Sequence, residues 1–487
     1  MNDPLPLAAR IAELRHGRVL CVGDAMLDRF VSGEVRRISP EAPIPVFQIK
    51  GEARMPGGAG NVVRNVTALG GSACLVAVVG DDAEGRELSA MVEAEERLEP
   101  RLVVEAGRPS TVKTRFIASG QQLLRTDRET TRPIADATAD KVSSLATDAV
   151  GSCDVVVLSD YAKGVLTEAV VEAVIGAARA AQKPVVVDPK GADFSRYRGA
   201  TVLTPNRGEL AVATGMPTDD DDSVIAAARA LIELCEAEAV LVTRGQDGMS
   251  LVGRDTAACH LPAEAREVYD VSGAGDAVVA TFAAALGHGA PFDDAARLAN
   301  HAAGIVVGKV GTAVVYGDDL LHAVHANEWS VIEAKIATLA GALERVERWR
   351  RKGLRIGFTN GCFDLLHPGH VSLLAQAKAA CDRLIVGLNS DASVTRLKGP
   401  DRPIQAESAR AQVLASLASI DVVVTFDEDT PIALLEALRP DLLVKGADYS
   451  VDQVVGADLV RRHGGKVMLA KLEPGHSTTE TIARIAK

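Results

Sequence analysis

The chain contains 487 residues, 47% of them hydrophobic and 24% charged, and 53 lysines and arginines against 65 aspartates and glutamates give a net charge of −12. This length accommodates roughly two to four globular domains with substantial cores, which excludes a disordered chain and a small disulfide-stabilised scaffold. The negative charge argues against nucleic acid or an anionic membrane as the main partner, because the average field of the protein would repel both.

The cysteines and the hydropathy pattern indicate in which compartment the protein is expected. Seven cysteines lie far apart without a C-x-x-C pair, which favours buried free thiols over a disulfide framework or a thiolate zinc site. The first twenty residues carry charges and no sustained apolar segment, and no run of about eighteen uncharged apolar residues occurs. We therefore expect a soluble, cytoplasmic protein with small-molecule partners, no nucleic acid and no membrane partner.

Short β-branched runs alternate with alanine-rich helical stretches over the first 320 residues. The expected strands are 18–22, 73–79, 154–158, 184–187, 200–203 and 239–243. Continuous apolar strands separated by amphipathic helices are typical of a mostly parallel sheet with helices on both faces. The sequence therefore predicts an α/β domain, which we place at residues 1–325.

A second series of the same kind begins at Arg355. Strands are expected at 355–359, 383–388, 421–425 and 442–444, and helices at 368–381 and 408–417. This alternation predicts a compact, doubly wound domain at residues 353–487.

Between the two domains, apolar residues recur at steps of three and four. They are Ile332, Ile336, Leu339, Leu343, Val346 and Trp349. The spacing predicts an amphipathic helix over residues 326–352. Two roles stay open for it, packing on the second domain or forming a dimer seam. We expect a homo-oligomer, with the dimer as its state.

The familiar nucleotide-binding loops do not occur in the sequence. Residues 304–309 (GIVVGK) place three residues between their glycines where a P-loop has four, and Val310 stands where its hydroxyl belongs. No G-x-G-x-x-G follows the first strand of either domain, which argues against a dinucleotide-dependent dehydrogenase.

A glycine-rich turn at residues 270–276 (DVSGAGD) precedes an uninterrupted helix-forming segment. Gly273, Ala274 and Gly275 would place backbone N–H groups at a helix N-terminus, where they can bind an anion. Asp276 would lie in the first turn, accepting a proton from a hydroxyl while the amides stabilise a transferring phosphoryl group. The alternative is an aspartate that only caps the turn.

Further polar residues lie near the ends of predicted strands. Residues 57–61 (GGAGN) open a helix at which a ligand can approach the backbone closely and Asn61 can bond sugar hydroxyls. Asp24 and Asp28 follow the first strand, at the usual ligand crevice of an open α/β sheet. Asn206 and Glu209 stand one helical turn apart, which suits hydrated magnesium beside phosphates, with an ordinary capped helix as the alternative.

Residues 57–61 and 270–286 (DVSGAGDAVVATFAAAL) resemble the two signatures of the ribokinase-type carbohydrate kinase family, and the resemblance covers residues 10–320. It implies a ribokinase-like fold, with Asp276 as the catalytic base and Gly273, Ala274 and Gly275 as the anion hole. The implied ATP contacts are Asn206, Arg207, Gly208, Glu209, Thr243, Gly245 and Asn300. The implied sugar contacts are Asp24, Gly57, Gly58 and Asn61, to which we add Asp28 and Lys113 as candidates.

The resemblance also implies a metal ion. Mg²⁺ would accompany ATP, with Glu209 holding it indirectly. Asp270 matches a position at which some relatives hold a monovalent cation.

Residues 358–370 (FTNGCFDLLHPGH) join the first strand of the second domain to its first helix. His367 and His370 at the helix start could be metal ligands, a buried structural pair, or donors that grip a nucleoside triphosphate as pyrophosphate leaves. No nearby cysteine or carboxylate at ligand spacing completes a tetrahedral metal site, so our hypothesis is phosphate recognition.

Three later segments, 398–403, 444–449 and 475–479, add donors of the same kind. With residues 358–370 they resemble the H-x-G-H nucleotidyltransferase superfamily of small cytidylyl- and adenylyltransferases, over about residues 353–487. The resemblance implies a small Rossmann-like fold. The implied triphosphate contacts are Thr359, Asn360, His367, His370, Lys398, Arg402, Ser477, Thr478 and Thr479.

Residues 37–47, 159–166 and 444–449 extend the resemblance to a family of fusion enzymes. It is the family of bifunctional heptose 7-phosphate kinases and heptose 1-phosphate adenylyltransferases of bacterial lipopolysaccharide core synthesis. Sugar phosphates and ATP are then the expected partners. The cationic candidates for the sugar 7-phosphate are Arg36, Arg37, Lys113, Arg115 and Lys163.

Two alternatives stay open. One is the same pair of folds with another sugar or nucleotide, such as a CDP-polyol synthase fused to a sugar phosphate kinase. The other is a non-catalytic sugar or nucleotide sensor built on enzyme folds.

Overall fold

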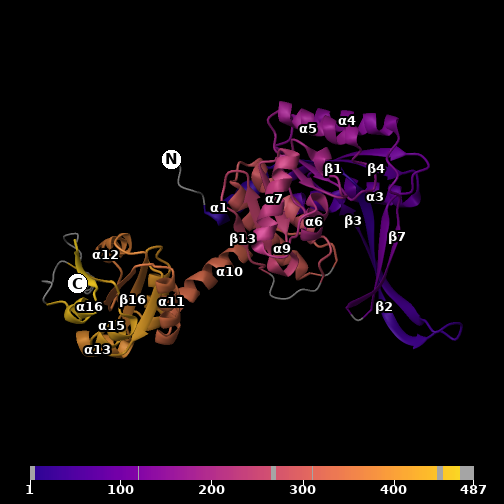
Figure 1. Cartoon of the computed structure of the whole chain (residues 1–487). Helices are drawn as coiled ribbons and strands as arrows, with labels where there is room; N and C mark the ends of the chain where they lie inside the picture. The colour runs from indigo at the N-terminus through magenta and orange to yellow at the C-terminus, as the bar shows by residue number, and fades with distance from the viewer. Residues whose placement is uncertain (1–5, 119, 265–269, 310, 447–452, 472–487) are drawn as a thin grey trace, which may run out of the picture. The chain divides into compact units, whose positions relative to one another are not determined.

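The computed structural model describes residues 6–118, 120–264, 270–309, 311–446 and 453–471. The chain divides into two compact units, Met1–His325 and Ala326–Lys487, each with its own sheet and helices (Figure 1). The α/β class expected from the sequence is confirmed for both units.

The first unit is built on a central sheet of nine strands among the described residues, in the order β13-β12-β11-β10-β9-β8-β1-β4-β5. All neighbours pair in parallel except β11–β12 and β12–β13. The strands are β1 Arg18–Gly23, β4 Ser72–Gly80, β5 Leu98–Glu105, β8 Val155–Ser159, β9 Val185–Asp188, β10 Val202–Leu203, β11 Ala239–Thr243, β12 Met249–Gly253 and β13 Cys259–Leu261.

Helices cover both faces of this sheet. In β1, Val19 and Cys21 belong to one hydrophobic core, whereas Leu20 and Val22 belong to the core on the other face, as the two-residue period of a strand requires. The helices of this unit are α1 Leu7–Glu13, α2 Ala59–Ala68, α3 Ala83–Glu93, α4 Asp136–Val150, α5 Glu168–Ala180, α6 Arg207–Thr214, α7 Asp221–Cys235, α8 Ala274–Gly287 and α9 Phe292–Val307, with short 3₁₀ turns η1 Leu14–His16, η2 Ser195–Tyr197 and η3 Gly245–Asp247.

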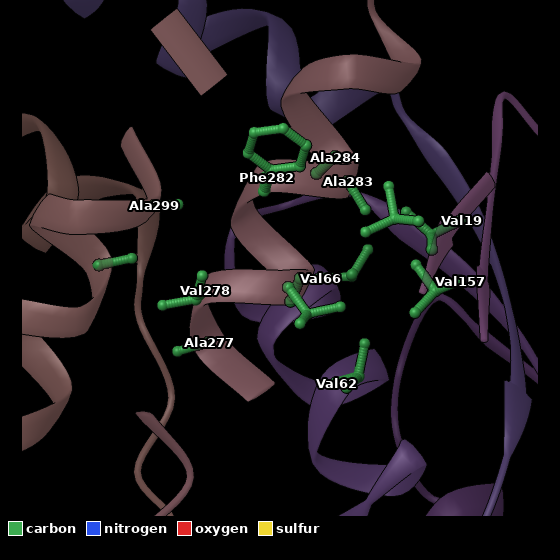
Figure 2. Packing of buried hydrophobic residues seen from close by; sticks show 14 of the residues in the cluster. Val19, Val62, Val66, Val157, Ala277, Val278, Phe282, Ala283, Ala284 and Ala299 are labelled. Carbon is green, nitrogen blue, oxygen red and sulfur yellow. The ribbon is translucent and has the colours of Figure 1, made fainter. Parts of the chain in front are cut away.

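Helix α8 has no solvent-exposed face over most of its length. Residues 276–285 are all buried, and most of them are alanine or valine. Figure 2 shows Val278 and Phe282 of α8 close to Val66 of α2, with Val19 of the sheet nearby. Small side chains let neighbouring helices and strands approach the α8 backbone closely, which fixes the position of its first turn.

A second, four-stranded sheet has the order β3-β2-β6-β7. It consists of β2 Ala25–Ile38, β3 Pro45–Gly58, β6 Val112–Ala118 and β7 Gln121–Arg128. Figure 1 shows the long β2 strand projecting from the rest of the first unit. The sequence did not predict this sheet, although β3 ends at Gly57 and Gly58 and leads directly into α2.

The described residues of the second unit form a six-stranded, all-parallel sheet in the order β14-β17-β16-β15-β18-β19. Its strands are β14 Ile336–Ala337, β15 Ile356–Gly361, β16 Arg383–Asn389, β17 Val422–Phe426, β18 Leu442–Gly446 and β19 Lys466–Ala470. Its helices are α11 Leu339–Arg351, α12 Pro368–Ala379, α13 Asp391–Lys398, α14 Glu407–Ala415, α15 Ile432–Leu438 and α16 Ala457–Arg462. The doubly wound arrangement expected from the sequence is confirmed.

The prediction of a single helix over residues 326–352 is wrong. Helix α10 (Gly317–Lys335) ends before the short strand β14, which pairs with β17, and α11 begins afterwards at Leu339–Arg351. Thr338 caps α11 by accepting a hydrogen bond from the backbone N–H of Gly341. Ala342 and Val346 of α11 are fully buried in the core of the second unit, in agreement with the first of the two roles considered. The pairing of β14 with β17 at the sheet edge therefore interrupts an apolar spacing that, from sequence alone, predicts one continuous helix.

Among the described residues, no helix combines the length and apolar character needed to cross a bilayer.

Replacement of Phe282 by alanine tests the packing of α8. Phe282 is fully buried and stacks on Phe292 with ring centroids 6.5 Å apart. We expect Phe282→Ala to lower the free energy of unfolding of the first unit by about 3–5 kcal/mol, because it leaves a cavity in the core. Urea denaturation followed by circular dichroism measures the change. The control Val212→Ala, on the exposed face of α6, should change it by no more than about 0.5 kcal/mol; equal effects would contradict the described core.

Candidate active sites

Asp276 lies in the first turn of α8 with 3% of its surface exposed. Two donors fix its carboxylate. The Asn61 side-chain amide donates to Oδ2 at 2.8 Å, and the Tyr161 hydroxyl donates to Oδ1 at 2.5 Å. A carboxylate has about four lone-pair positions, so each oxygen keeps capacity to accept a further proton donor. The geometry suits a general base that is oriented before substrate arrives.

Burial sets the proton affinity of this carboxylate. Loss of solvation raises the pKa of Asp276 to about 6, and the hydrogen bonds from Tyr161 and Asn61 oppose the rise. The nearby Asp28 carboxylate raises it further. A base with a pKa close to neutrality is ionised at pH 7 and is still basic enough to take a proton in a transition state.

The glycine turn before α8 is required by its conformation and by its neighbours. Gly273 has φ +80°, and a Cβ atom there would lie 2.8 Å from the Asn61 amide nitrogen. The N–H of Ala274 donates to the Val271 carbonyl at 3.3 Å. Of the three amides predicted from the sequence to form an anion hole, that of Ala274 is thus engaged within the turn, whereas Gly275 lines a pocket.

Asp24 is not directed toward solvent, since only 1% of it is exposed. Its carboxylate accepts hydrogen bonds from the backbone N–H groups of Tyr161, Lys163 and Val165, at 2.9, 2.9 and 3.2 Å. The structure thus gives this residue, expected to contact sugar, a role in holding the loop after β8. That loop carries the hydroxyl that bonds Asp276.

Gly57, Gly58 and Asp28 form a close-packed corner between β2 and β3. A Cβ atom on Gly57 would lie 2.2 Å from Asp28 Oδ2, and Gly58 has φ +58°. Arg115 donates to Asp28 Oδ1 at 2.6 Å within a buried ion pair. Burial raises the pKa of Asp28 and the Arg115 charge opposes the rise. The absence of a side chain at Gly57 therefore leaves room for the Asp28 carboxylate, which is paired with Arg115.

A pocket of about 180 Å³ lies next to the first turn of α8. It brings together Asn206, Glu209, Thr243 and Gly275 from the predicted set. Asn206 and Glu209 form a reciprocal capping box at the start of α6, and Lys190 bonds Glu209 Oε1 at 2.6 Å. The capped helix considered as the alternative for Asn206 and Glu209 is thus present, and both residues also line the pocket.

Other predicted residues of the first unit lie outside the lining of this pocket. The Asn300 amide donates to the Pro262 carbonyl at 2.8 Å. Arg207 pairs with Asp247, and Gly245 begins η3 with φ +61°. Gly208 follows Arg207 in the first turn of α6.

Four of the five cationic candidates for the sugar 7-phosphate, Arg36, Lys113, Arg115 and Lys163, are engaged with carboxylates. Lys113 bonds Asp127 and Glu129 at 3.3 and 3.4 Å, and Lys163 bonds Glu129 at 2.8 Å. Arg36 pairs with Glu34 and is largely exposed. No hydrogen bond or ion pair in the described residues distinguishes Arg37 as a phosphate ligand.

Sequence reasoning assigned no individual role to Tyr161, Asp188 or Lys190, which line the same pocket. Burial, together with the charges of Asp276 and Glu209, raises the pKa of Asp188 well above its usual range. The signal for Asp188 was its place directly after the strand at 184–187, at the carboxyl edge of the sheet. Tyr161 offered only a place in a loop, and its contact with α8 depends on tertiary packing.

In the second unit, His367 caps α12 and His370 lies in its first turn. The two imidazole rings stack with centroids 3.8 Å apart, and Phe363 lies 5.2 Å from His370. Burial and the neighbouring imidazole lower the pKa of His370 to about 4. Its ring is therefore neutral at pH 7 and can donate one N–H bond at a helix N-terminus, where the peptide dipoles favour an anion.

The remaining predicted residues lie around the same end of the sheet. Thr359 is buried in β15, and the Asn360 carbonyl accepts a hydrogen bond from Lys445 at 2.9 Å. Arg402 pairs with the buried carboxylate of Asp364, which links the 398–403 segment to the loop before α12. Lys398 is exposed at the end of α13. Ser477, Thr478 and Thr479 lie outside the described residues.

The sequence pattern did not indicate Arg410, whose side chain connects several loops of this site. It is 1% exposed and donates to the carbonyls of Cys362, Asn389 and Gln405 and to the Asp391 carboxylate, at 2.7–3.0 Å. These groups belong to the segments that follow β15, follow β16 and precede α14. One buried guanidinium thus ties together the loops at the carboxyl ends of the strands.

A matched pair of glycine substitutions tests the turn before α8. Gly273 and Gly289 both have positive φ, but a Cβ atom at Gly289 meets nothing within 4 Å. We expect Gly273→Ala to displace Asn61 and to lower the sugar phosphorylation expected at this site by about 10²-fold, because small displacements of reacting groups cost that much. Gly289→Ala should keep activity within a few-fold of wild type. Similar losses in both variants would assign the effect to backbone strain alone.

Comparison with known proteins agrees with this division of sites. Residues 17–316 match a family model described as pfkB family carbohydrate kinase, and residues 358–484 match one described as cytidylyltransferase-like. A relative named bifunctional protein HldE from Paramagnetospirillum magneticum is 60% identical over 485 residues, which cover 100% of this chain and 99% of that protein. The protein of the same name from Rhodospirillum rubrum is 59% identical over 484 residues, 99% of this chain and 98% of its own.

Solved structures share the fold of the first unit. Escherichia coli phosphofructokinase-2 in complex with fructose-6-phosphate superposes with a TM-score of 0.55 at 20% identity, covering 64% of this chain and 99% of that one. Arabidopsis thaliana ribokinase complexed with ribose and ATP gives a TM-score of 0.50 at 21% identity, with coverage of 63% and 99%. The chain belongs to the family of bifunctional HldE proteins, with a pfkB-type carbohydrate kinase unit followed by a nucleotidyltransferase unit.

Proposed function

We propose that the chain catalyses two steps in the synthesis of ADP-heptose for the lipopolysaccharide core. The first unit phosphorylates D-glycero-β-D-manno-heptose 7-phosphate at O1 with ATP, giving the 1,7-bisphosphate. The second unit transfers the adenylyl group of ATP to the heptose 1-phosphate, giving ADP-heptose and pyrophosphate. The observation that carries the proposal is 60% identity over the whole chain to a bifunctional HldE protein. A separate phosphatase removes the 7-phosphate between the two steps.

Asp276 performs the proton transfer of the kinase step. The sugar O1 attacks the γ-phosphorus of ATP, the bond to the β–γ bridging oxygen breaks, and ADP leaves. Asp276 takes the O1 proton as the new bond forms. The Asn61 amide donates to the carboxylate, and the amides of the α8 N-terminus stabilise charge on the transferring group.

The pocket beside Asp276 offers oxygen donors of the kind that Mg²⁺ prefers. They are the carboxylates of Asp188 and Glu209 and the side chain of Asn206. The described residues contain no cluster of three or more His, Cys, Asp or Glu that would bind a metal alone, which fits an ion shared with ATP phosphates. Mg²⁺ held there, in part through water, would neutralise phosphate charge.

The second unit needs no covalent intermediate. An oxygen of the heptose 1-phosphate attacks the α-phosphorus of ATP and pyrophosphate leaves. The imidazoles of His367 and His370 donate to the phosphates at the start of α12, and the charges of Lys398 and Arg402 balance the leaving group. Ser477, Thr478 and Thr479 complete the proposed triphosphate contacts.

A cytoplasmic location and a homodimeric state belong to the same proposal. ATP, the co-substrate of both steps, is a cytoplasmic metabolite. Sedimentation velocity of the purified chain measures its state of association.

Phosphorus NMR tests the function directly. The purified chain is incubated with magnesium, ATP and heptose 7-phosphate, with and without a heptose bisphosphate phosphatase. An anomeric phosphate and ADP should form in both tubes, and a pyrophosphate-linked ADP-sugar only in the second. Unchanged spectra would refute the heptose assignment. A nucleotide-linked sugar formed only with CTP would show that CTP, and not ATP, is the substrate of the second unit.

Replacement of the proposed base separates the two activities. Asp276→Asn removes proton acceptance while it keeps the size of the side chain. We expect sugar phosphorylation to fall by about 10²-fold or more, the typical contribution of a general base. Adenylyl transfer by the same preparation serves as the control and should stay at the wild-type rate. Equal loss of both activities would refute separate sites.

His370→Ala provides the reciprocal test. The substitution removes a phosphate donor from the start of α12, so pyrophosphate release from ATP and heptose 1-phosphate should be abolished. The kinase activity measured in parallel should persist. Wild-type pyrophosphate release would return the histidine pair to a structural role.

A further inference from the structure

The hydroxyl of Tyr161 has a position that the kinase mechanism does not require for chemistry. It donates to Asp276 Oδ1 at 2.5 Å, a length typical of a hydrogen bond from a hydroxyl to an ionised acceptor. Tyr161 also lines the pocket that contains Gly275 and Glu209. The contact joins the loop after β8 to the first turn of α8, two segments separated by more than a hundred residues.

The loop is held in this position by a second buried carboxylate. Asp24, at the end of β1, accepts the backbone N–H groups of Tyr161, Lys163 and Val165. Three bonds to successive parts of one loop restrict its backbone, and Gly164 within it has φ +88°. The hydroxyl therefore reaches Asp276 from a fixed support, as is required of a residue that orients a catalytic group.

We propose that Tyr161 is a positioning residue of the kinase site, whose hydroxyl orients the Asp276 carboxylate and stabilises its ionised form. This inference rests on the proposed kinase function and adds a residue whose role follows from its contact with the base. Tyr161 stays a donor throughout, because burial and the neighbouring carboxylates raise the pKa of its hydroxyl well above the usual value.

The groups around Asp276 act in opposite directions. Burial and the Asp28 carboxylate on β2 favour the protonated form, whereas the donors Tyr161 and Asn61 favour the ionised form. Asp188 on β9 and Cys21 on β1 also interact electrostatically with Asp276, and the Asp276 charge contributes to raising the pKa of each. Removal of the Tyr161 hydroxyl must then raise the pKa of the base.

Tyr161→Phe tests the inference through the pH dependence of the kinase. The base must be ionised to work, so kcat/KM falls as pH drops through its pKa. We expect this acid limb to move to higher pH by about one unit in the variant, because loss of a hydrogen bond to a charged group changes a pKa by about that amount. At a pH well above the limb, the rate should recover toward wild type. Adenylyl transfer should be unchanged.

Tyr197→Phe is a matched control. Tyr197 is fully buried, and its hydroxyl donates to a different carboxylate, Asp160 Oδ2, at 2.6 Å. The control removes the same group from the same region, and its acid limb should coincide with that of wild type. If Tyr161→Phe lowers the rate equally at every pH, the role of Tyr161 is merely structural.

The outcomes separate this inference from the function on which it rests. A wild-type chain that does not phosphorylate heptose 7-phosphate refutes the proposed function and, with it, this role. An active wild type with an unmoved limb in Tyr161→Phe refutes the role of Tyr161 alone. A limb that moves equally in Tyr161→Phe and Tyr197→Phe also refutes it, because the effect would then follow from any loss of a buried hydroxyl in this region.

Discussion

The first unit depends on a carboxylate that is kept in a nearly solvent-free position. Asp276 begins a run of ten buried residues in α8, so it cannot turn toward water when it ionises. A buried charge without donors is strongly disfavoured. The donors Asn61 and Tyr161 come from α2 and from the loop after β8. Three separate parts of the chain must therefore reach their places for one side chain to carry its charge.

The second site solves a different electrostatic problem. His367 and His370 lie at a helix N-terminus, where the His370 ring is a neutral donor, and the cations of Lys398 and Arg402 lie on a neighbouring segment. No proton has to be stored at an aspartate, because the attacking group is a phosphate that is already ionised. The buried Arg410 supports this site from behind by bonding three loop carbonyls. Both sites use the carboxyl ends of parallel strands, yet only the first requires a base with a raised pKa.

The sequence indicates the parallel sheets well, because buried parallel strands are continuous apolar runs. It also indicates the turn before α8, since glycines followed by an aspartate and a long apolar helix carry both conformation and chemistry. It does not reveal the β2–β3–β6–β7 sheet, whose strand β7 is exposed along its entire length and has no apolar pattern. The end of α10 was missed for a related reason: pairing of β14 with β17 overrides a helical period.

Residues that act through other residues were the hardest to find. Tyr161 and Arg410 belong to loops and helices with no distinguishing pattern, and their roles follow from contacts across 115 and up to 48 positions of sequence. Asp24 shows the opposite case. Its place at a strand end suggested a sugar contact, whereas its carboxylate in the structure holds a backbone loop and is enclosed by it. Position along a strand indicates where a polar group lies and leaves its partners undetermined.

The most direct test is a titration of Asp276 itself. The chain is labelled with ¹³C at the aspartate carboxyl carbons, and the Asp276→Asn spectrum assigns the resonance by its absence. We expect the Asp276 resonance to titrate with a midpoint of about pH 6, because burial raises its pKa and the hydrogen bonds from Tyr161 and Asn61 oppose only part of the rise. A midpoint at the ordinary aspartate value of 3.8 would show a solvated carboxylate, and the buried base on which the first site is built would be contradicted.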